Sequence, residues 1–146
     1  MDPKINRFVN SGAIAVVGVS SSKMKFGTWA YRSLKKNGYR VFGVNPSLGS
    51  CEGDTCYASL SELPEPVEAV LVSVKPEKVG NLISEATRHG VKRLWFQEGA
   101  DYSKLADQAS EAGLEVVTDR CLLLYAEPVT GIHRVHRFFA KLFGKL

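Results

Sequence analysis

The chain alternates between short, almost wholly apolar stretches and segments in which apolar residues recur every three or four positions. An unbroken apolar stretch is typical of a strand buried on both faces of a sheet, and the second pattern is typical of an amphipathic helix. Strands are therefore expected at residues 13–17, 39–44, 67–74, 93–97 and 114–118. Helices are expected at residues 4–12, 27–37, 76–88 and 102–112.

Glycines mark the ends of three of these helices in the same way. Residues 37–40, 89–92 and 112–115 each hold a glycine, an apolar residue and a charged residue directly before or within the start of a strand. Glycine in such a position ends a helix. Strands alternating with helices predict an α/β fold: a single Rossmann-like, doubly wound domain with a five-stranded, mainly parallel sheet and helices on both faces.

Two regions do not follow the alternation. Glycine, serine, proline and acidic residues dominate residues 47–66, which predicts a long connection with one helical turn at residues 59–63. The second region is the C-terminal tail. We therefore expect a domain at residues 1–125, followed by a basic amphipathic helix within residues 126–146.

The excess positive charge of the chain lies in this tail. Residues 131–146 hold four of the 19 basic residues and no acidic one, so that 15 basic residues balance 15 acidic ones elsewhere. The domain itself therefore gives no indication of nucleic acid binding. The tail has apolar residues on one helical face and cations opposite, and it is expected to dock on its own domain, on a second copy or partner, or on an anionic membrane surface.

Length and composition are those of one globular domain, with 146 residues, 45% hydrophobic and 23% charged. No apolar stretch approaches the roughly 18 residues of a membrane span, and the start lacks a signal-peptide pattern. A cytoplasmic location with reduced thiols is expected. Cys51, Cys56 and Cys121 are too few for a disulfide framework, and Cys51 with Cys56 alone would not complete a zinc site.

Polar residues, glycine and proline gather where the expected strands end. In a parallel sheet ligands bind beyond the carboxyl ends of the strands, so these residues are candidates for a binding site. An apolar stretch that ends in glycine and small hydroxyl residues before a helix is typical of a phosphate-binding turn. The candidates at the first three strand ends are Gly18, Val19, Ser20, Lys23, Lys25, Asn45, Pro46, Val74, Lys75 and Pro76. The candidates at the fourth strand end are Gln97, Glu98 and Gly99.

The sequence departs from two common nucleotide motifs. A dinucleotide fingerprint that starts at Gly18 would need glycines where Ser20 and Lys23 stand, and Asn45 stands where an acid would bind the ribose. The Gly-Lys-Ser/Thr triplet of a P-loop is absent from the sequence. These departures weigh against NAD and against a P-loop nucleotide. The sequence still predicts a ligand that carries phosphate, but the strand-end residues do not identify which one.

Five motifs taken together resemble the CoA-binding domain family. They are residues 17–20, 43–46, 59–64, 95–99 and 119–121. The resemblance covers residues 7–121, and the family is related to the CoA-binding domain of the succinyl-CoA synthetase alpha subunit and, more distantly, to NAD-binding redox-sensing repressors. CoA as the ligand is what the resemblance implies.

The resemblance also implies a role for each strand end. Gly18, Val19 and Ser20 would meet the pyrophosphate, with Lys23 or Lys25 on a phosphate. Asn45 and Pro46 would lie near the ribose or its phosphate. Val74, Lys75 and Pro76 would border the adenine, and Gln97, Glu98 and Gly99 the pantetheine arm.

The synthetase reaction does not carry over, because its phosphohistidine lies on a second domain that has no counterpart here. A non-catalytic protein that binds CoA or an acyl-CoA is therefore expected. The alternatives are an NAD(H)-binding module on the same fold, an interaction protein acting through its tail, and an acyl-CoA enzyme using Cys121. Cys121 is expected to be either a small buried residue or a thiol that forms a mixed disulfide with CoA.

Four further residues are expected to have structural roles. Asp119 and Arg120 are expected to form a local ion pair. Trp29 and Trp95 are expected to be packing residues.

Overall fold

A seven-stranded sheet in the order β3-β4-β2-β1-β5-β6-β7 forms the centre of the protein, in a computed structural model that describes residues 2–126. The strands are β1 (Ala13–Val17), β2 (Arg40–Val44), β3 (Ser50–Cys51), β4 (Asp54–Tyr57), β5 (Ala69–Val72), β6 (Arg93–Gln97) and β7 (Glu115–Arg120). The α-helices are α1 (Pro3–Val9), α2 (Phe26–Lys36), α3 (Leu82–Arg88) and α4 (Ser103–Glu111). Three 3-10 turns are η1 (Leu60–Glu62), η2 (Pro76–Lys78) and η3 (Leu122–Leu124).

The sheet is parallel except for β3, which runs antiparallel to β4. The chain first builds outward from β1 to β2 and then crosses to β5 on the other side of β1. The order of the strands therefore reverses between β1 and β5. The predicted Rossmann-like α/β fold is confirmed, and the predicted number of five strands is wrong.

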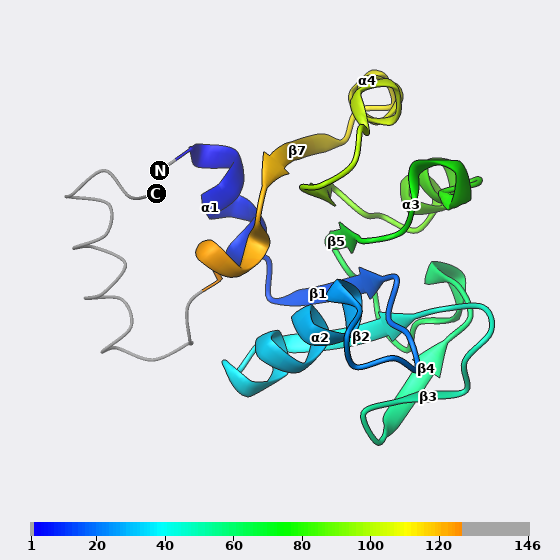
Figure 1. The fold of residues 1–146 in the computed structure, drawn as a ribbon. Coiled ribbons are helices and arrows are strands. Elements are labelled where there is room, and N and C mark those ends of the chain that lie inside the picture. Colours follow the sequence, from blue (N-terminus) through cyan, green and yellow to red (C-terminus); the bar gives the residue numbers. More distant parts are fainter. Residues whose placement is uncertain (1, 127–146) are drawn as a thin grey trace, which may run out of the picture.

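Helices cover both faces of the sheet (Figure 1). One apolar cluster packs α1, α2 and η3 against one face, with Phe8, Leu34 and Leu122 fully buried. A second cluster packs α3 and α4 against the other face around Phe96 and Leu94. The two clusters explain why β1, β5 and β6 are almost wholly apolar, since both faces of these strands are covered.

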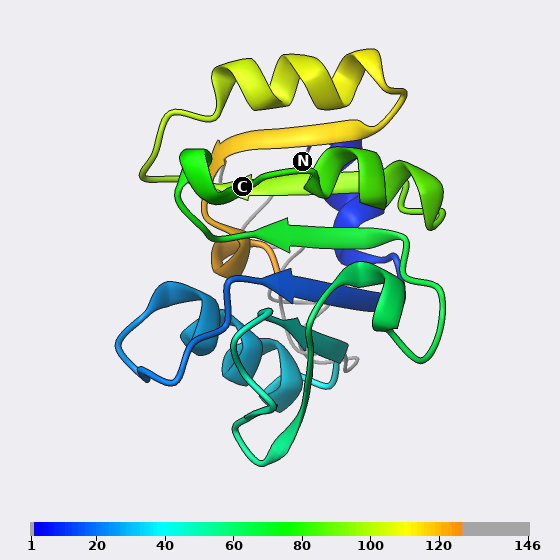
Figure 2. The ribbon, with the colours of Figure 1, turned by 90° about the vertical axis from the view of Figure 1, so that its right-hand side faces the viewer.

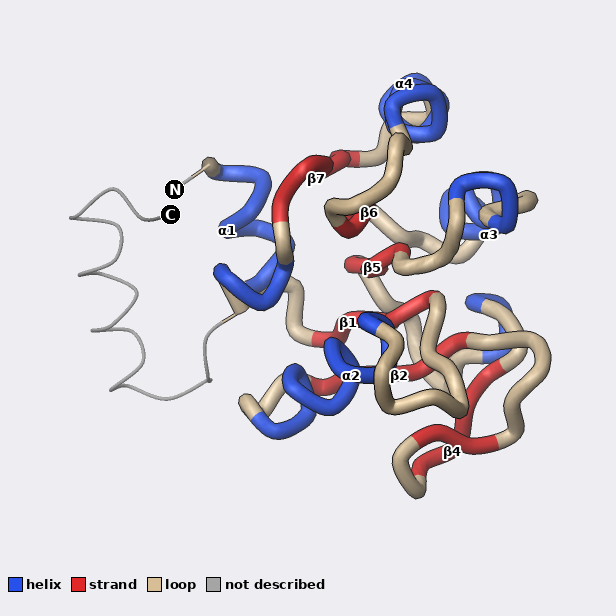
Figure 3. Tube along the Cα trace, viewed as in Figure 1, coloured by secondary structure: helices blue, strands red, loops and turns tan. Residues whose placement is uncertain are grey.

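The two missed strands form a hairpin in the expected connection (Figure 3). The turn between them is Glu52-Gly53, and both residues have positive φ, at 52° and 82°. Such a pair of left-handed residues is what a two-residue hairpin turn requires. The strands are too short to show a period, but Cys51 and Cys56 are buried in the cluster with α2, which ties the hairpin to the domain. Both thiols are free.

The helix expected at residues 76–88 is also divided. Pro76 begins the single turn η2, and α3 begins only at Leu82. Gly80 has a φ of 60°, which interrupts a right-handed helix between the two pieces. Val79, Leu82 and Ala86 are nevertheless buried together, as their spacing predicted.

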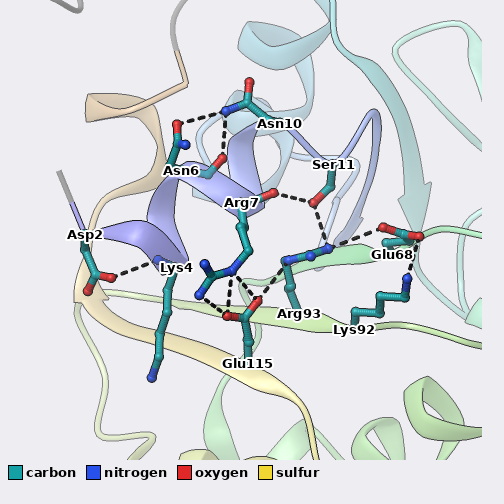
Figure 4. Close-up of polar contacts among 10 residues, drawn as sticks. All are labelled: Asp2, Lys4, Asn6, Arg7, Asn10, Ser11, Glu68, Lys92, Arg93 and Glu115. Carbon is teal, nitrogen blue, oxygen red and sulfur yellow. Dashed lines mark hydrogen bonds and ion pairs between the residues drawn. The ribbon is translucent and has the colours of Figure 1, made fainter.

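A cluster of charged side chains joins α1 to the amino-terminal ends of the strands (Figure 4). Glu115 of β7 accepts from Arg7 of α1 and from Arg93 of β6. Arg93 also bonds Glu68, which pairs with Lys92 at 3.1 Å. These cations lower the pKa of Glu115, with the hydrogen bond from Arg7 as the largest cause. The cluster lies at the end of the sheet opposite the predicted site.

We expect Glu115→Gln to lower the free energy of unfolding by about 1 kcal/mol at neutral pH, because a partly buried arginine pair loses its shared carboxylate. The pKa of Glu115 is below its ordinary value of 4.5 in the fold, so its contribution is present above pH 4.5 and is lost as the pH falls through the folded pKa. Urea unfolding at pH 7 and pH 3 measures both effects.

The loss caused by Glu115→Gln should therefore shrink at pH 3. Glu111→Gln is the control, since Glu111 is exposed and makes no ion pair within residues 2–126. An equal loss from both variants would contradict the expected role of Glu115.

The expected C-terminal helix and the tail at residues 126–146 lie outside the described residues, except for the buried Ala126. Their docking therefore stays a prediction. In residues 2–126, no helix combines the length and the apolar character that a membrane crossing requires.

Candidate functional site

A cleft of about 1340 Å³ opens at the carboxyl ends of the parallel strands, across the point where strand order reverses. Figure 2 shows β1, β5, β6 and β7 pointing the same way, toward the loops that form this end of the domain. The ends of β1, β2, β5 and β6 contribute to the lining, together with the start of α2. This is the place at which a doubly wound sheet binds ligands.

Most of the predicted site residues come together in this cleft. Those that line it are Gly18, Val19, Ser20, Lys25, Asn45, Pro46, Val74, Lys75, Gln97, Glu98 and Gly99. Lys23 and Pro76 are the predicted residues outside the lining. Lys23 is exposed on the loop before α2, and Pro76 begins η2. A role for either in binding stays a prediction.

Gly18 and Gly27 allow three backbone segments to meet at the floor of the cleft. A Cβ at Gly18 would lie 2.3 Å from the carbonyl oxygen of Ser73, and the φ of Gly18 is 120°. A Cβ at Gly27 would lie 2.2 Å from the carbonyl oxygen of Gly18. The missing side chains therefore let β1, β5 and α2 approach one another. At Gly18 this internal contact, more than room for a phosphate, explains the need for glycine.

The loop from Ser20 to the start of α2 is held by hydroxyl groups. The Ser20 amide donates to Thr28 Oγ1 and the Thr28 hydroxyl donates to the Ser20 carbonyl, both at 2.9 Å. The Ser22 amide donates to Ser20 Oγ at 3.1 Å. This arrangement holds the loop against the first turn of α2, with Thr28 buried.

The N-terminus of α2 faces the cleft without a side-chain cap. Its N-cap residue Lys25 makes no capping hydrogen bond, and both Phe26 and Gly27 line the cleft. The first N–H groups of a helix have no carbonyl partner within the helix, and they carry a partial positive charge. Anions such as phosphates bind favourably at such a position.

Lysines add full positive charges around the same cleft. Lys25 comes from the loop before α2, Lys75 precedes η2, and Lys78 ends η2. All three are exposed, and none forms an ion pair within residues 2–126. Glu98 is the acidic residue in the lining. The cleft therefore favours a ligand with several negative charges.

Asn45 lies on the cleft, but its side chain holds the protein together. Its Nδ2 donates to the Val19 carbonyl at 2.7 Å, and its Oδ1 accepts from the Ser47 amide at 2.7 Å. The side chain thus joins the end of β2 to the turn after β1. An acidic residue here would lack the N–H group that binds Val19, which gives a structural reason for asparagine at this strand end.

Aromatic residues that the sequence did not single out form part of the walls. Tyr102 stacks on Phe96, with ring centroids 5.0 Å apart, and its hydroxyl donates to the Val74 carbonyl. Burial raises the pKa of Tyr102. Trp29, 53% exposed, lines the cleft and meets Phe26 edge to face.

The expected packing role is therefore confirmed for the buried Trp95 and wrong for Trp29. Trp29 lies on the exposed side of α2, at the wall of the cleft. The spacing of apolar residues in a helix does not show that a cleft lies beside that side.

The chain after β7 brings Cys121 to the cleft. Asp119 has a φ of 59°, and Trp95 Nε1 donates to the Arg120 carbonyl at 2.9 Å. Arg120 donates to the Asp119 carbonyl oxygen, so the expected ion pair with the Asp119 carboxylate is wrong. Cys121 is half-buried and lines the cleft, which rules out the fully buried core position. A mixed disulfide at its thiol stays a prediction.

Within residues 2–126, no group of three or more His, Cys, Asp or Glu side chains is placed to hold a metal ion. Cys51 and Cys56 are buried, and burial raises the pKa of both thiols.

The family model described as "CoA binding domain" matches residues 12–127 of this chain. The chain belongs to the CoA-binding domain family. The match begins just before β1 and runs past η3, so it includes every strand and every described residue of the cleft.

Similar proteins fall into two groups. Uncharacterized protein YneT of Bacillus subtilis (strain 168) is 26% identical over 112 residues, which are 77% of this chain and 83% of that protein. The alpha subunit of acetate–CoA ligase [ADP-forming] II of Pyrococcus furiosus is 26% identical over 129 residues, which are 81% of this chain. This chain spans only 28% of the length of that subunit.

Solved structures show the same two groups. A hypothetical protein from Pyrococcus horikoshii OT3 matches with a TM-score of 0.78 and 31% identity, over 84% of this chain and 87% of that one. Acetyl-coenzyme A synthetase 1 of Ca. Korarchaeum cryptofilum matches with a TM-score of 0.68 and 29% identity. That match covers 77% of this chain and 26% of the synthetase. The matched part of this larger synthetase therefore has the fold described here.

Proposed function

We propose that this protein binds coenzyme A, free or acylated, in the cleft at the carboxyl ends of the strands and does not turn it over. The observation that carries the proposal is the uncapped N-terminus of α2, which faces the cleft of a CoA-binding domain. Lys25, Lys75 and Lys78 line the same cleft. CoA has a pyrophosphate and a 3′-phosphate, and these anions match the charges of that cleft.

The shape of the ligand also suits the cleft. The turn after β1 and the start of α2 would take the pyrophosphate, and the lining continues past Val74 and Tyr102 to Gln97 and Cys121. An elongated ligand with a charged end and an uncharged arm would use both parts. Pro46 and Trp29 lie at the exposed rim, where an adenine ring could be partly covered.

A binding role without turnover is supported by the surroundings of Cys121. A nucleophilic thiol needs a base or a positive group that stabilises the thiolate. Within residues 2–126, no hydrogen bond or ion pair joins the Cys121 thiol to such a group. Tyr102, a titratable residue that also lines the cleft, donates its hydroxyl to the Val74 carbonyl.

The test is titration calorimetry of the full chain with CoA, NAD and NADH. We expect CoA to bind with a dissociation constant at least about tenfold lower than either dinucleotide, which corresponds to about 1.4 kcal/mol. Asn45 motivates this order, because its amide is already bound to Val19 and Ser47 and it offers no carboxylate to a ribose. Tighter binding of NAD or NADH would show that the alternative is right.

Two further measurements complete the test. Mass spectrometry of the native protein would identify a ligand that is retained during purification. Incubation with acetyl-CoA, followed by assay of free thiol, should show no hydrolysis above the buffer rate. Thioester cleavage that is lost in Cys121→Ser would instead establish an enzyme. A cytoplasmic location stays a prediction that fractionation would test.

A further inference from the structure

A second, smaller pocket lies at the amino-terminal end of the sheet, away from the cleft. Its volume is about 270 Å³, and it is lined by η1, by the residues that lead from η1 to β5, and by His89 and Val91 after α3. Leu60, Val67 and Val91 are its buried apolar residues. Sites for small molecules usually exceed about 300 Å³. The pocket therefore has a size that suits an inserted side chain better than a cofactor.

The described part of the chain ends near the same end of the sheet. The carbonyl oxygen of Ala126 accepts from Asn37 Nδ2 at 3.2 Å, at the C-terminal end of α2. Three residues later, Arg40 begins β2, and its Nε lies 2.6 Å from Oε1 of Glu65, which lines the pocket. Three residues span at most about 11 Å. The contacts of Ala126 thus lead in a few steps to the rim of the pocket.

The rest of the chain is long enough to reach the pocket. Phe138 comes 12 residues after Ala126 in the sequence. Such a stretch spans about 18 Å as a helix and up to about 40 Å when extended. Phe138 and Phe139 belong to the expected apolar face of the tail, and aromatic side chains are the common anchors that fill pockets at interfaces.

Few other apolar surfaces of the described domain could receive this face. The large apolar side chains that are exposed within residues 2–126 are Met24, Trp29 and Leu124. Met24 and Trp29 lie at the start of α2, at the opposite end of the domain from Ala126. Leu124 lies close to the end of the described chain, but it is outside both pockets. The pocket beside η1 therefore offers an aromatic anchor a better site than these single side chains.

The two segments also carry opposite charge. Residues 47–74 hold five acidic residues and no lysine or arginine, whereas residues 131–146 hold four basic residues and no acidic one. Next to the pocket, Glu65 is already paired with Arg40, but Glu62 of η1 forms no ion pair within residues 2–126. Arg88 comes from the end of α3. Cations of the tail are therefore expected beside η1 rather than beside α3.

We propose that the C-terminal tail docks on its own domain and inserts Phe138 or Phe139 into the pocket beside η1. The basic residues of the tail then lie toward Glu62. Docking at this place closes the amino-terminal end of the sheet and leaves the cleft at the carboxyl ends of the strands open.

Blocking the pocket should release the tail. Ser61 is exposed and lines the pocket, so Ser61→Arg fills the pocket and repels the cations of the tail. Trypsin should cleave the full-length variant after Arg137 about tenfold faster than the wild type, as followed by mass spectrometry. Ser110→Arg is the matched control, because Ser110 is an exposed serine of α4 outside the pocket, and it should leave the rate unchanged. Urea unfolding establishes that both variants are folded.

The converse substitution should expose the pocket. In the full chain with Phe138→Ser and Phe139→Ser, amide hydrogen exchange at residues 60–67 should be about tenfold faster than in the wild type. Exchange in α4, which does not line the pocket, should stay the same and serves as the internal reference.

Equal cleavage of the wild type and a folded Ser61→Arg variant would overturn the proposal. Faster cleavage in Leu124→Gln but not in Ser61→Arg would also overturn it, because the tail would then lie against η3. Protection that rises with protein concentration, together with a doubled mass by light scattering, would assign the tail to a second copy and overturn docking on its own domain. None of these measurements uses CoA, so their outcome is independent of the proposed function.

Discussion

Gly27→Ala should lower the free energy of unfolding by about 2 to 4 kcal/mol, although alanine is the better helix former. Gly27 lies in the first turn of α2, where alanine would ordinarily gain up to about 1 kcal/mol. Here its Cβ would lie 2.2 Å from the carbonyl oxygen of Gly18 and 3.2 Å from the amide nitrogen of Val19. Backbone atoms have no other rotamer, so α2 must move away from β1.

Urea unfolding with an unchanged m-value measures this loss. Gly49→Ala is the matched control, because Gly49 has open space around its Cβ position and no positive φ. It should change the free energy of unfolding by less than about 0.5 kcal/mol. A Gly27→Ala protein as stable as the wild type would show that α2 does not pack as closely on Gly18 as described.

The same substitution should also weaken CoA binding. The start of α2 and the turn after Gly18 together form the floor of the cleft, so a shift of α2 would displace both parts of the proposed phosphate site. Titration at a temperature where the variant remains folded separates this effect from unfolding.

Replacing Lys25, Lys75 and Lys78 together by glutamine should weaken CoA binding at least about a hundredfold at low salt. Each of these lysines lines the cleft, and a charged hydrogen bond to a phosphate is commonly worth about 1.5 kcal/mol or more. Wild-type affinity should fall as salt is raised, and the triple variant should lose most of that dependence. Calorimetry at two salt concentrations measures both quantities.

Lys104→Gln is the control, because Lys104 is an exposed lysine of α4 outside the lining of the cleft. Single variants titrated with CoA and with dephospho-CoA identify the lysine that meets the 3′-phosphate, since only that variant should bind the two ligands alike. Lys23→Gln tests the remaining predicted lysine in the same way. Unchanged affinity in the triple variant would contradict an electrostatic role of this cleft.

Much of the fold could be predicted because the sheet is covered on both faces. β1 and β5 are apolar throughout and β6 is apolar between Arg93 and Gln97, and the glycines after α2, α3 and α4 separate each helix from the next strand. The hairpin of β3 and β4 was missed for a physical reason. Its pairing depends on a left-handed turn at Glu52-Gly53 and on burial of two cysteines beneath α2, and neither leaves a period in such short strands.

The position of the site could be predicted from topology alone, since the carboxyl ends of parallel strands meet at one edge. The roles of individual side chains could not. The strand-end position of Asn45 predicts a contact with a ribose, whereas its side chain bonds Val19 and Ser47 within the protein. The Gln97 side chain accepts from the amide of Leu122, 25 residues away in sequence, and Tyr102 joins the wall only because it stacks on Phe96.

The charged cluster around Glu115 and the cleft lie at opposite ends of the same strands, which makes this domain a suitable host for redesign. The loop that follows β6 can be exchanged for another without changing the arginines that hold α1 at the far end, whereas Asn45 after β2 must stay to join Val19 to Ser47. Substitutions for a new ligand in that loop would then leave the stabilising contacts at the far end of the sheet unchanged. Gly18 and Gly27 must not be changed in such a redesign, because the backbone atoms that form the floor of the cleft there also pack in the core.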